Sequence, residues 1–513
     1  MTQENRIKNL EKQNKELRNQ VKNLTEMVNY LTKKRFGRSS EKTRNELDGQ
    51  ISLFNEEEPD SDDEPEPKKV EVKKYTRRSK GQKEKLIKDL PVEIVEYKLD
   101  GEDLKCPWCG TLMQPIGEEN VRQEIEVIPA KVIVKQYVRY SYSCPQCAKD
   151  GESTIIKAPI PEPLIKRSLA SASAVSHVIH EKYVNAVPLY RQEKEWHRYG
   201  VDLSRTTLAN WIIKCAQEWL KPVTDKLREL LLNRDILHAD ETPIQVLNEP
   251  GKKATTQSYV WLYRSGNDGK PPIVLFEYRP SRSGDNAVKY LDGFNGYLHT
   301  DGYKGYDKLK NITRCGCWAH LRRYFIDAVP SNIKPSKEIT NAEKGRNYCN
   351  KLFEIEKTLK NMDCDKRKAE RVKQEKPVLD AFWCWLQTLN PLRGSKLGKA
   401  VQYAINQRPY MENYLLDGRC TISNNIAENS IRPFTLGRKN WLFSTSTKGA
   451  EATAIIYSLI ETAKANSLDA YKYIKYLLTT MPKLKQECLS ENIAEVMPWS
   501  DIAIENCRDK RNE

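Results

Sequence analysis

The sequence contains no apolar run long enough to cross a membrane. A transmembrane helix takes about 18 or more consecutive apolar residues, and none occurs among the 513 residues. The first residues, Met1 to Lys8, also lack the apolar core of a secretory signal. The 13 cysteines, an odd number that includes two CxxC pairs, fit a reducing cytoplasm with a metal site better than a disulfide framework. The expected compartment is therefore the cytoplasm.

Acidic residues are too few to balance the basic ones. The chain has 85 Lys and Arg against 70 Asp and Glu, which gives a formal net charge of +15. A basic excess of this size favours a polyanionic partner, most often nucleic acid. Solubility alone is the competing explanation of the charge. The chain is also long enough for several domains.

The N-terminal segment, residues 1–36, has a heptad repeat. Leucine recurs every seven residues, mostly with a β-branched residue three positions earlier, and the two series are Leu10, Leu17, Leu24 and Leu31, and Ile7, Asn14, Val21 and Val28. Leucine at d with β-branched residues at a favours a parallel two-stranded coiled coil, and a single asparagine at a fixes its register. The segment predicts a homodimer or a higher homo-oligomer. The alternative is one amphipathic helix that packs on its own chain.

Residues 37–90 have the composition of a charged linker. The stretch Glu56–Glu66 is dense in Asp, Glu and Pro, and the stretch Lys68–Lys88 is strongly basic. Low hydrophobicity with blocks of like charge is typical of a chain that cannot bury a core. The linker is therefore predicted to be disordered.

Two CxxC pairs predict a zinc-binding domain over residues 91–158. The first pair is Cys106 and Cys109, and the second is Cys144 and Cys147. Two residues between thiols allow both sulfurs to bind one tetrahedral, structural Zn²⁺. The stretch 124–140 between the pairs alternates and is rich in β-branched residues, so it predicts strands. The gap between the pairs is wider than in the commonest zinc ribbons.

Residues 159–233 are predicted to form a helical DNA-binding region. Within it, residues 196–211 have the pattern of a helix, a glycine turn and a second helix capped by Ser204. Arg205, Thr206 and Asn210 would point outward from the second helix and contact DNA. This is the pattern of a helix-turn-helix, but ordinary helical hairpins share it.

The pattern changes to strands at residue 235. Three strands are predicted at 236–247, 258–264 and 273–278, followed by a short helix at 285–291 and a strand at 296–301 that ends at Asp301. A further strand at 314–320 leads into a helix at 321–329, and residues 336–420 form a long helical stretch without strands. We interpret 234–445 as a mixed α/β domain with a helical insertion at about 331–420. Residues 446–513 are interpreted as a C-terminal helical region.

Three carboxylates in this domain are the candidate catalytic residues. Asp240 and Asp301 close apolar, strand-like runs, and Glu428 lies near the start of a predicted helix. A lone buried carboxylate would be costly there without a cation. Carboxylate oxygens suit Mg²⁺, and two such ions support phosphoryl transfer in many nucleases. If the three side chains converge, they predict an enzyme that cuts and joins DNA.

A histidine precedes each of the two aspartates by two residues. Because side chains alternate along a strand, His238 shares a strand face with Asp240, and His299 shares one with Asp301. We interpret both histidines as support for the site, with simple packing as the alternative. Glu241 should point to the opposite face, so it is left out of the metal ligands.

Several motifs together resemble transposases of the insertion-sequence-66 family. Besides the two CxxC pairs, they lie in the family's order along nearly the whole chain, at Phe36–Lys42, His238–Pro243, Thr300–Tyr303, Cys317–Arg323, Ala427–Pro433, Gly437–Phe443 and Tyr457–Lys464. The resemblance implies an α/β ribonuclease H-like core with an Asp-Asp-Glu triad. That triad maps onto Asp240, Asp301 and Glu428, with no departure at these positions.

The resemblance further implies a bacterial, nucleoid-associated DNA transposase. It would use Mg²⁺ (or Mn²⁺) to cut at the ends of an insertion sequence, and the freed 3′-hydroxyl would attack target DNA. Its partners would be double-stranded DNA, namely terminal repeats and target, and accessory proteins of the same element are a further partner class. Arg432, Arg438 and Lys439 would grip phosphates near the cut, and Trp441 or Phe443 would stack on a flipped base. An ordinary basic face with core aromatics is the alternative.

Two other functions fit part of these observations. A zinc-containing DNA-binding regulator would explain the charge, the heptads and the CxxC pairs, but not three carboxylates at the edges of a separate domain. A structure-specific nuclease would cut DNA without joining it. Metal-dependent cleavage and the strand-transfer product distinguish the three.

Overall fold

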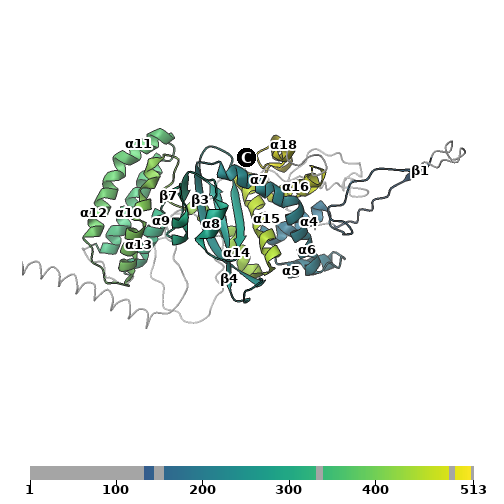
Figure 1. Cartoon of the computed structure of the whole chain (residues 1–513), viewed down its shortest axis with the longest axis horizontal. Coiled ribbons are helices and arrows are strands. Elements are labelled where there is room, and N and C mark those ends of the chain that lie inside the picture. Colours follow the sequence, from purple (N-terminus) through teal and green to yellow (C-terminus); the bar gives the residue numbers. More distant parts are fainter. Residues whose placement is uncertain (1–131, 144–154, 331–338, 485–491, 510–513) are drawn as a thin grey trace, which may run out of the picture. The chain divides into compact units, whose positions relative to one another are not determined.

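The computed structural model describes residues 132–143, 155–330, 339–484 and 492–509 (Figure 1). The predicted coiled coil, the linker and all four CxxC cysteines lie outside these residues. The strands predicted within 124–140 are not found in the described part of that stretch, 132–140, and strand β1 (Ser141–Ser143) begins just after it. It pairs with β2 (Ile155–Lys157). Among the described residues, no helix is both long and apolar enough to span a bilayer.

A mixed sheet forms the centre of the described chain. Its five main strands are β3 (Ile236–Asn248), β4 (Gln257–Ser265), β5 (Val274–Arg279), β6 (Tyr297–His299) and β7 (Thr313–Cys315). They lie in the order β5-β4-β3-β6-β7. The first three pair antiparallel, while β6 is parallel to both β3 and β7. The three predicted long strands are confirmed, whereas the strand before Asp301 ends two residues earlier than predicted.

The central strand β3 is covered on both faces at its start. Residues 236–239 are all buried, and exposure begins to alternate only from 240 onward. A continuous apolar run is typical of a strand with neighbours on both faces. The second half of β3 also pairs in parallel with β8 (Phe443–Ser446). Asp240 therefore lies where the buried part of the strand gives way to its more open part.

Helices precede the sheet in the chain, as the sequence predicts. They are α4 (Ala172–Tyr183), α5 (Leu189–Arg198), α6 (Arg205–Cys215), the π-helical turn η2 (Ala216–Leu220) and α7 (Lys221–Leu232). Gly200 follows α5 with φ of 81°, a left-handed conformation that suits glycine. The Ser204 hydroxyl then caps α6 by accepting from the Thr207 amide at 3.2 Å. The predicted helix, turn and capped second helix are confirmed.

One long helix, α15 (Thr447–Ala465), packs against the edge strand β5. Its Ser458 and Thr462 hydroxyls accept hydrogen bonds from the amides of Phe276 and Val274, at 2.7 and 3.0 Å. Covering the amides of an edge strand removes a site of unwanted strand pairing. The chain continues into α16 (Ala470–Leu484) and α18 (Asp501–Cys507). Their buried residues belong to the same hydrophobic core as those of α4 to α7 and the sheet.

A second core lies in the helical insertion. Its helices are α10 (Asn341–Leu359), α11 (Cys364–Gln374), α12 (Lys376–Gln387) and α13 (Lys396–Met411). Of these, α10 and α13 contact α9 (Trp318–Ala328), which follows β7. The ring of Trp318 on α9 lies 5.4 Å from that of Phe382 on α12. The insertion is strand-free in its described part, as predicted, and it returns to the sheet through η4 (Asn413–Leu416).

Candidate active site

Asp240 lies on the central strand β3 opposite Leu262 of β4. Its Oδ1 accepts a hydrogen bond from the Glu241 amide at 2.9 Å, and the side chain is only partly exposed. Four buried residues precede it, so the strand is held firmly up to the carboxylate. β3 thus presents Asp240 from a rigid element at the point where the core ends.

Asp301 lies two residues beyond the end of β6, in a loop fixed by Arg314 of β7. Nε of Arg314 donates to the Thr300 hydroxyl at 2.7 Å, and its Nη2 donates to the Asp301 carbonyl at 2.6 Å. The Oδ1 atom of Asp301 accepts from the Tyr303 amide at 2.9 Å. Because Arg314 is itself buried, the loop cannot shift without breaking these hydrogen bonds.

Glu428 is in the first turn of α14 (Asn425–Trp441). The amino end of a helix favours a negative side chain, and the Arg323 guanidinium of α9 adds to this effect. Arg323 Nη2 lies 3.3 Å from Glu428 Oε2, and His320 Nδ1 lies 3.6 Å from Oε1. Because His320 and Arg323 are three residues apart, they share one face of α9.

The three predicted carboxylates lie close enough to influence one another. Burial, followed by the charges of Glu241, Asp301 and Glu428, raises the pKa of Asp240 to about 8. The charges of Glu428 and Asp301 also both act on His320. Asp301, from the loop after β6, and Glu428, from α14, therefore lie within electrostatic reach of Asp240 on β3. Neighbouring carboxylates are a suitable donor set for a hard divalent cation, which would offset their repulsion.

Glu241, the residue after Asp240, is bound by protein donors. Its Oε1 accepts from Arg282 Nε and Nη2 at 2.9 and 2.6 Å, and its Oε2 accepts from the Tyr306 hydroxyl at 2.7 Å. Burial and the charge of Asp301 raise its pKa, while Tyr306 and Arg282 oppose that rise. With both oxygens engaged, Glu241 is the less suitable metal ligand.

The two histidines form a stacked pair behind the carboxylates. The rings of His238 and His299 are 4.4 Å apart and nearly parallel, at 14°. Nδ1 of His238 lies 2.9 Å from Oδ1 of Asn424, which caps the helix that carries Glu428. Asn424 in turn donates to the Ala239 carbonyl at 2.8 Å. His238 thus ties β3 to α14, and burial lowers its pKa to about 4, so the ring is neutral at neutral pH.

Three residues near the carboxylates were not given a role from the sequence. His320 and Arg323 belong to the motif Cys317–Arg323, and Asn424 lies just before the predicted helix of Glu428. The spacing of His320 and Arg323 on one helix face was the available signal. The buried contacts of Asn424 join residues about 185 positions apart, and no local pattern predicts such contacts.

The DNA-contact candidates of α6 are exposed. Arg205, Thr206 and Asn210 all face solvent on the first two turns of the helix. The Arg205 amide is held by Glu193 Oε1 at 2.9 Å, which fixes the start of α6 against α5. The predicted outward orientation is confirmed, and DNA contact stays a prediction.

The candidates of α14 differ in their surroundings. Arg432 and Lys439 are exposed. Arg438 instead donates to the Thr242 hydroxyl at 2.8 Å and to the Pro243 carbonyl of β3. Arg438 therefore joins α14 to β3, and fewer of its N–H groups remain for a phosphate.

The two aromatic candidates also differ. Trp441 is partly buried, with its ring 5.6 Å from that of Phe434. Phe443 is 41% exposed. Of the two, Phe443 is the side chain that is free to stack on a base.

Comparison with known protein families covers most of the chain. A family model described as the IS66 family transposase matches residues 167–452. A model described as the zinc-finger binding domain of transposase IS66 matches residues 103–148, and one described as the transposase C of IS166 homeodomain matches residues 23–95. A model described as the IS66 C-terminal element matches residues 458–499. The described sheet, α14 and the three carboxylates all fall within the first match. The second match contains the two CxxC pairs.

Three curated relatives come from Sinorhizobium fredii and are named uncharacterized proteins. Protein y4qI is 29% identical over 96% of this chain and 91% of its own length. Protein y4jD is 28% identical over 80% of this chain and 81% of its own, and y4hP is 27% identical over 90% and 86%. With the family model matching more than half of its residues, the chain belongs to the IS66 family of transposases.

Proposed function

We propose that this transposase cuts DNA at the ends of its insertion sequence and joins the freed 3′ ends to target DNA. The observation that carries the proposal is that the charges of Asp301 and Glu428, which lie on two other elements, both act on Asp240 of β3. Further support comes from the sheet order β5-β4-β3-β6-β7, with an antiparallel first half and a parallel second half. This arrangement is compatible with a ribonuclease H-like core.

Asp240, Asp301 and Glu428 would hold Mg²⁺ or Mn²⁺, two ions in all. Bound at these carboxylates, the ions would activate the attacking oxygen and stabilise the leaving oxygen of the phosphodiester. The protein groups supply position and charge. Arg314 fixes the loop of Asp301, and Asn424 fixes the helix of Glu428 against β3.

Positive groups around the carboxylates would contact the DNA backbone. Arg323 lies beside Glu428, and Arg432 and Lys439 are exposed on the same helix. Phosphate contacts of this kind set the register of the duplex but do not read its sequence. Recognition of the terminal repeats is assigned to α6, through Arg205, Thr206 and Asn210, and to the zinc-binding domain.

The remaining modules complete the proposal. Cys106, Cys109, Cys144 and Cys147 would bind structural Zn²⁺. The heptads of residues 1–36 would pair two protomers, so that one assembly holds both ends of the element. Accessory proteins of the element are further candidate partners. The expected location is the bacterial cytoplasm, in association with the nucleoid.

The test uses the full chain, duplex DNA that contains an element end, and Mg²⁺. Asp240→Asn, Asp301→Asn and Glu428→Gln should each lower cleavage and joining by at least about a hundredfold, the scale of losing one charge-stabilising group. Asp292→Asn makes the same change at an exposed aspartate and should leave both activities intact. Near-normal activity in the three variants would exclude the assignment.

The same assay separates the other candidate functions. Cleavage that leaves no strand-transfer product would indicate a nuclease. Binding of the DNA without metal-dependent cleavage would indicate a regulator. Only coupled cleavage and joining, both lost in the carboxylate variants, supports the transposase mechanism.

A further inference from the structure

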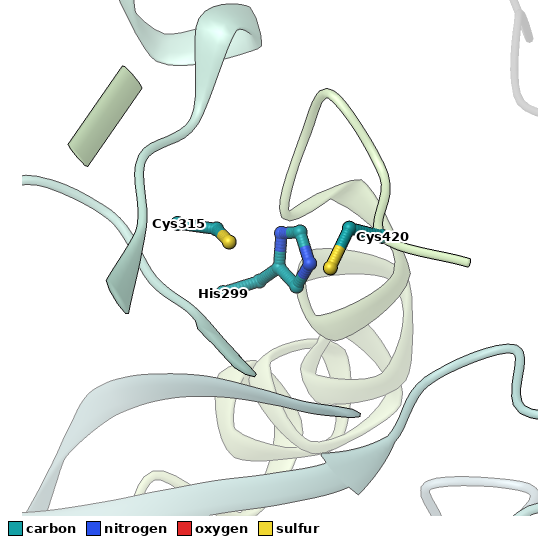
Figure 2. Close-up of side chains that lie close together, drawn as sticks. All are labelled: His299, Cys315 and Cys420. Atoms are coloured by element: carbon teal, nitrogen blue, oxygen red, sulfur yellow. The ribbon is translucent and has the colours of Figure 1, made fainter. Parts of the chain in front are cut away.

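Three side chains of types that can bind a metal ion lie close together at the ends of β6 and β7 and in the segment before α14. His299 ends β6, Cys315 ends β7, and Cys420 is in the segment between η4 and α14. One ligand atom of each lies within 4.8 Å of the others, and all three side chains are buried. Figure 2 shows both thiols directed toward the imidazole ring. Three separate parts of the chain therefore bring one nitrogen and two sulfur donors together.

The His299 ring has buried polar atoms without partners. The side chain is 1% exposed, and neither ring nitrogen has a hydrogen-bond partner in the part of the chain that the structure describes. A buried polar group left unpaired destabilises the folded chain. Such groups are rare in folded proteins and commonly mark a water or an ion. The nearby thiols, which are weak donors and acceptors, make an ion the better explanation.

We propose that His299, Cys315 and Cys420 bind a thiophilic metal ion, with Zn²⁺ as the expected occupant. Thiolate and imidazole are the ligands that Zn²⁺ takes most often, whereas Mg²⁺ takes oxygen. Ligand atoms at ordinary Zn–S and Zn–N lengths are about 3.5–4 Å apart, so the observed cluster needs only a small contraction.

Charge balance favours the same class of ion. Two thiolates and one divalent cation sum to zero, so the loaded site places no net charge in the core. A monovalent ion would leave one negative charge buried, which is costly. Arg371 lies near the site and donates from Nη2 to the Cys420 carbonyl at 2.8 Å, which holds the backbone of that ligand in place.

The site would have three protein ligands. His238 is the nearest further imidazole, but its ring is stacked on that of His299 at 4.4 Å. An ion bound in the plane of the His299 ring lies out of the plane of a parallel ring. His238 therefore cannot be the fourth ligand in this arrangement, and its nitrogen Nδ1 is already paired with Asn424.

The ion would bind residues that lie before and after the helical insertion. His299 is two residues before Asp301, and Cys420 lies eight residues before Glu428. Binding His299, Cys315 and Cys420 to one centre would fix the ends of β6 and β7 to the segment that leads into α14. The inference concerns a structural site and does not depend on the proposed cleavage reaction.

Metal content of the full chain tests the inference. The protein is purified under reducing conditions, and Zn, Cu and Fe are measured by mass spectrometry per mole of chain. A variant with serine at all four CxxC cysteines removes the expected zinc-domain site. That variant should still hold about one zinc per chain, because the buried cluster remains. Because this variant leaves His299, Cys315 and Cys420 unchanged, its zinc content reports on the buried cluster without any substitution in the core.

Substitution of the ligands gives the complementary result. Cys315→Ala and Cys420→Ala, made in the CxxC variant, should remove the remaining metal. Cys349→Ala removes a buried cysteine outside the cluster and should leave it. Replacement of zinc by Co²⁺ should produce a thiolate-to-metal absorption band that the two ligand variants lack.

Two results would overturn the inference. One is a CxxC variant that contains less than about a tenth of a metal ion per chain at a saturating zinc supply. The other is a Cys315–Cys420 disulfide in protein isolated from reducing cells. Both are measured without DNA, so failure of the cleavage proposal and failure of the metal site are independent outcomes.

Discussion

Replacing Asp240 with asparagine should stabilise the folded protein at alkaline pH when no divalent cation is bound. Burial and the neighbouring carboxylates raise the pKa of Asp240 from 3.8 to about 8. Below about pH 4 the group is protonated in both the folded and the unfolded chain. Between pH 4 and 8 the folded chain binds the extra proton, so its free energy of unfolding falls as the pH rises. Above pH 8 the penalty is complete.

The size of the loss of stability follows from the shift in the pKa of Asp240. At about 1.4 kcal/mol per pKa unit, the full shift corresponds to about 6 kcal/mol. Asp240 keeps partial contact with solvent, which screens the neighbouring charges, so roughly half of that, about 3 kcal/mol, is the realistic cost. Asparagine carries no charge at any pH and has nearly the same shape. The variant should therefore lack the loss of stability between pH 6 and 9.

Mg²⁺ should reverse the difference in stability between the wild-type chain and Asp240→Asn. An ion that binds the folded chain alone stabilises it by about 2.7 kcal/mol at a concentration of 100 times its Kd. The wild-type chain should gain this stability at pH 8, and Asp240→Asn should gain much less, because one of three ligands has lost its charge. Chelators are avoided in the metal-free samples, since they would also strip zinc.

The assay is urea denaturation followed by circular dichroism, at pH 6 and pH 9, with and without Mg²⁺. Asp292→Asn serves as the control, because it removes an exposed carboxylate. Equal pH dependence of the free energy of unfolding in wild type and Asp240→Asn would refute the argument that repulsion and burial raise the pKa of Asp240. Equal stabilisation of both by Mg²⁺ would refute the role of Asp240 as a metal ligand.

Two further variants probe other parts of the chain. Arg371 is fully buried and binds Glu356 through two hydrogen bonds of 2.5 and 2.9 Å, so Arg371→Met should cost about 3–5 kcal/mol in urea unfolding. The same change at the exposed Arg393 should cost little. Arg205→Ala should weaken binding to end-containing duplex and lower the slope of log K against log salt by about 1. Lys399→Ala removes an exposed charge outside α6 and should change neither the binding nor the salt slope. An equal loss of binding in both variants would contradict a specific DNA contact of Arg205.

Much of the fold was predictable because its elements have strong local patterns. β3, β4 and β5 are six or more residues long and contain several aliphatic or aromatic side chains, and their bounds agree with the predicted ones within a few positions. The α5-α6 hairpin was predictable from Gly200 and the Ser204 cap. β6 and β7 have only three residues each, and such short strands are defined by their neighbours more than by their own pattern.

The candidate carboxylates were identified by their position at the ends of apolar runs, but their surroundings were not. Which groups flank Glu428 depends on how the tertiary structure places α9 near the start of α14, and this brings Arg323, 105 residues away, into contact. The pairing of His238 with Asn424 spans 186 positions. No periodicity over a short window carries information about contacts at such separations.

The return of the chain from the helical insertion explains how Glu428 can reach the site reliably. A long insertion with its own core could leave α14 loosely placed, but backbone contacts on its return path prevent this. The Gly316 amide donates to the Tyr410 carbonyl at 2.9 Å, and the Trp318 amide donates to the Ile422 carbonyl at 3.1 Å. Both bonds join the segment after β7 to the end of the insertion.

Side chains then reinforce this junction. Asn413 donates to the Arg314 carbonyl at 2.7 Å, so the residue that fixes the Asp301 loop is also bound to the returning chain. These hydrogen bonds therefore hold the end of the insertion next to β7 and the segment that follows it. Because Arg314 binds the Asp301 loop through its side chain and Asn413 through its carbonyl, the position of Asp301 relative to the chain that leads to Glu428 depends on this junction. Removing the Asn413 amide should consequently impair the site more than shortening an exposed turn within the insertion.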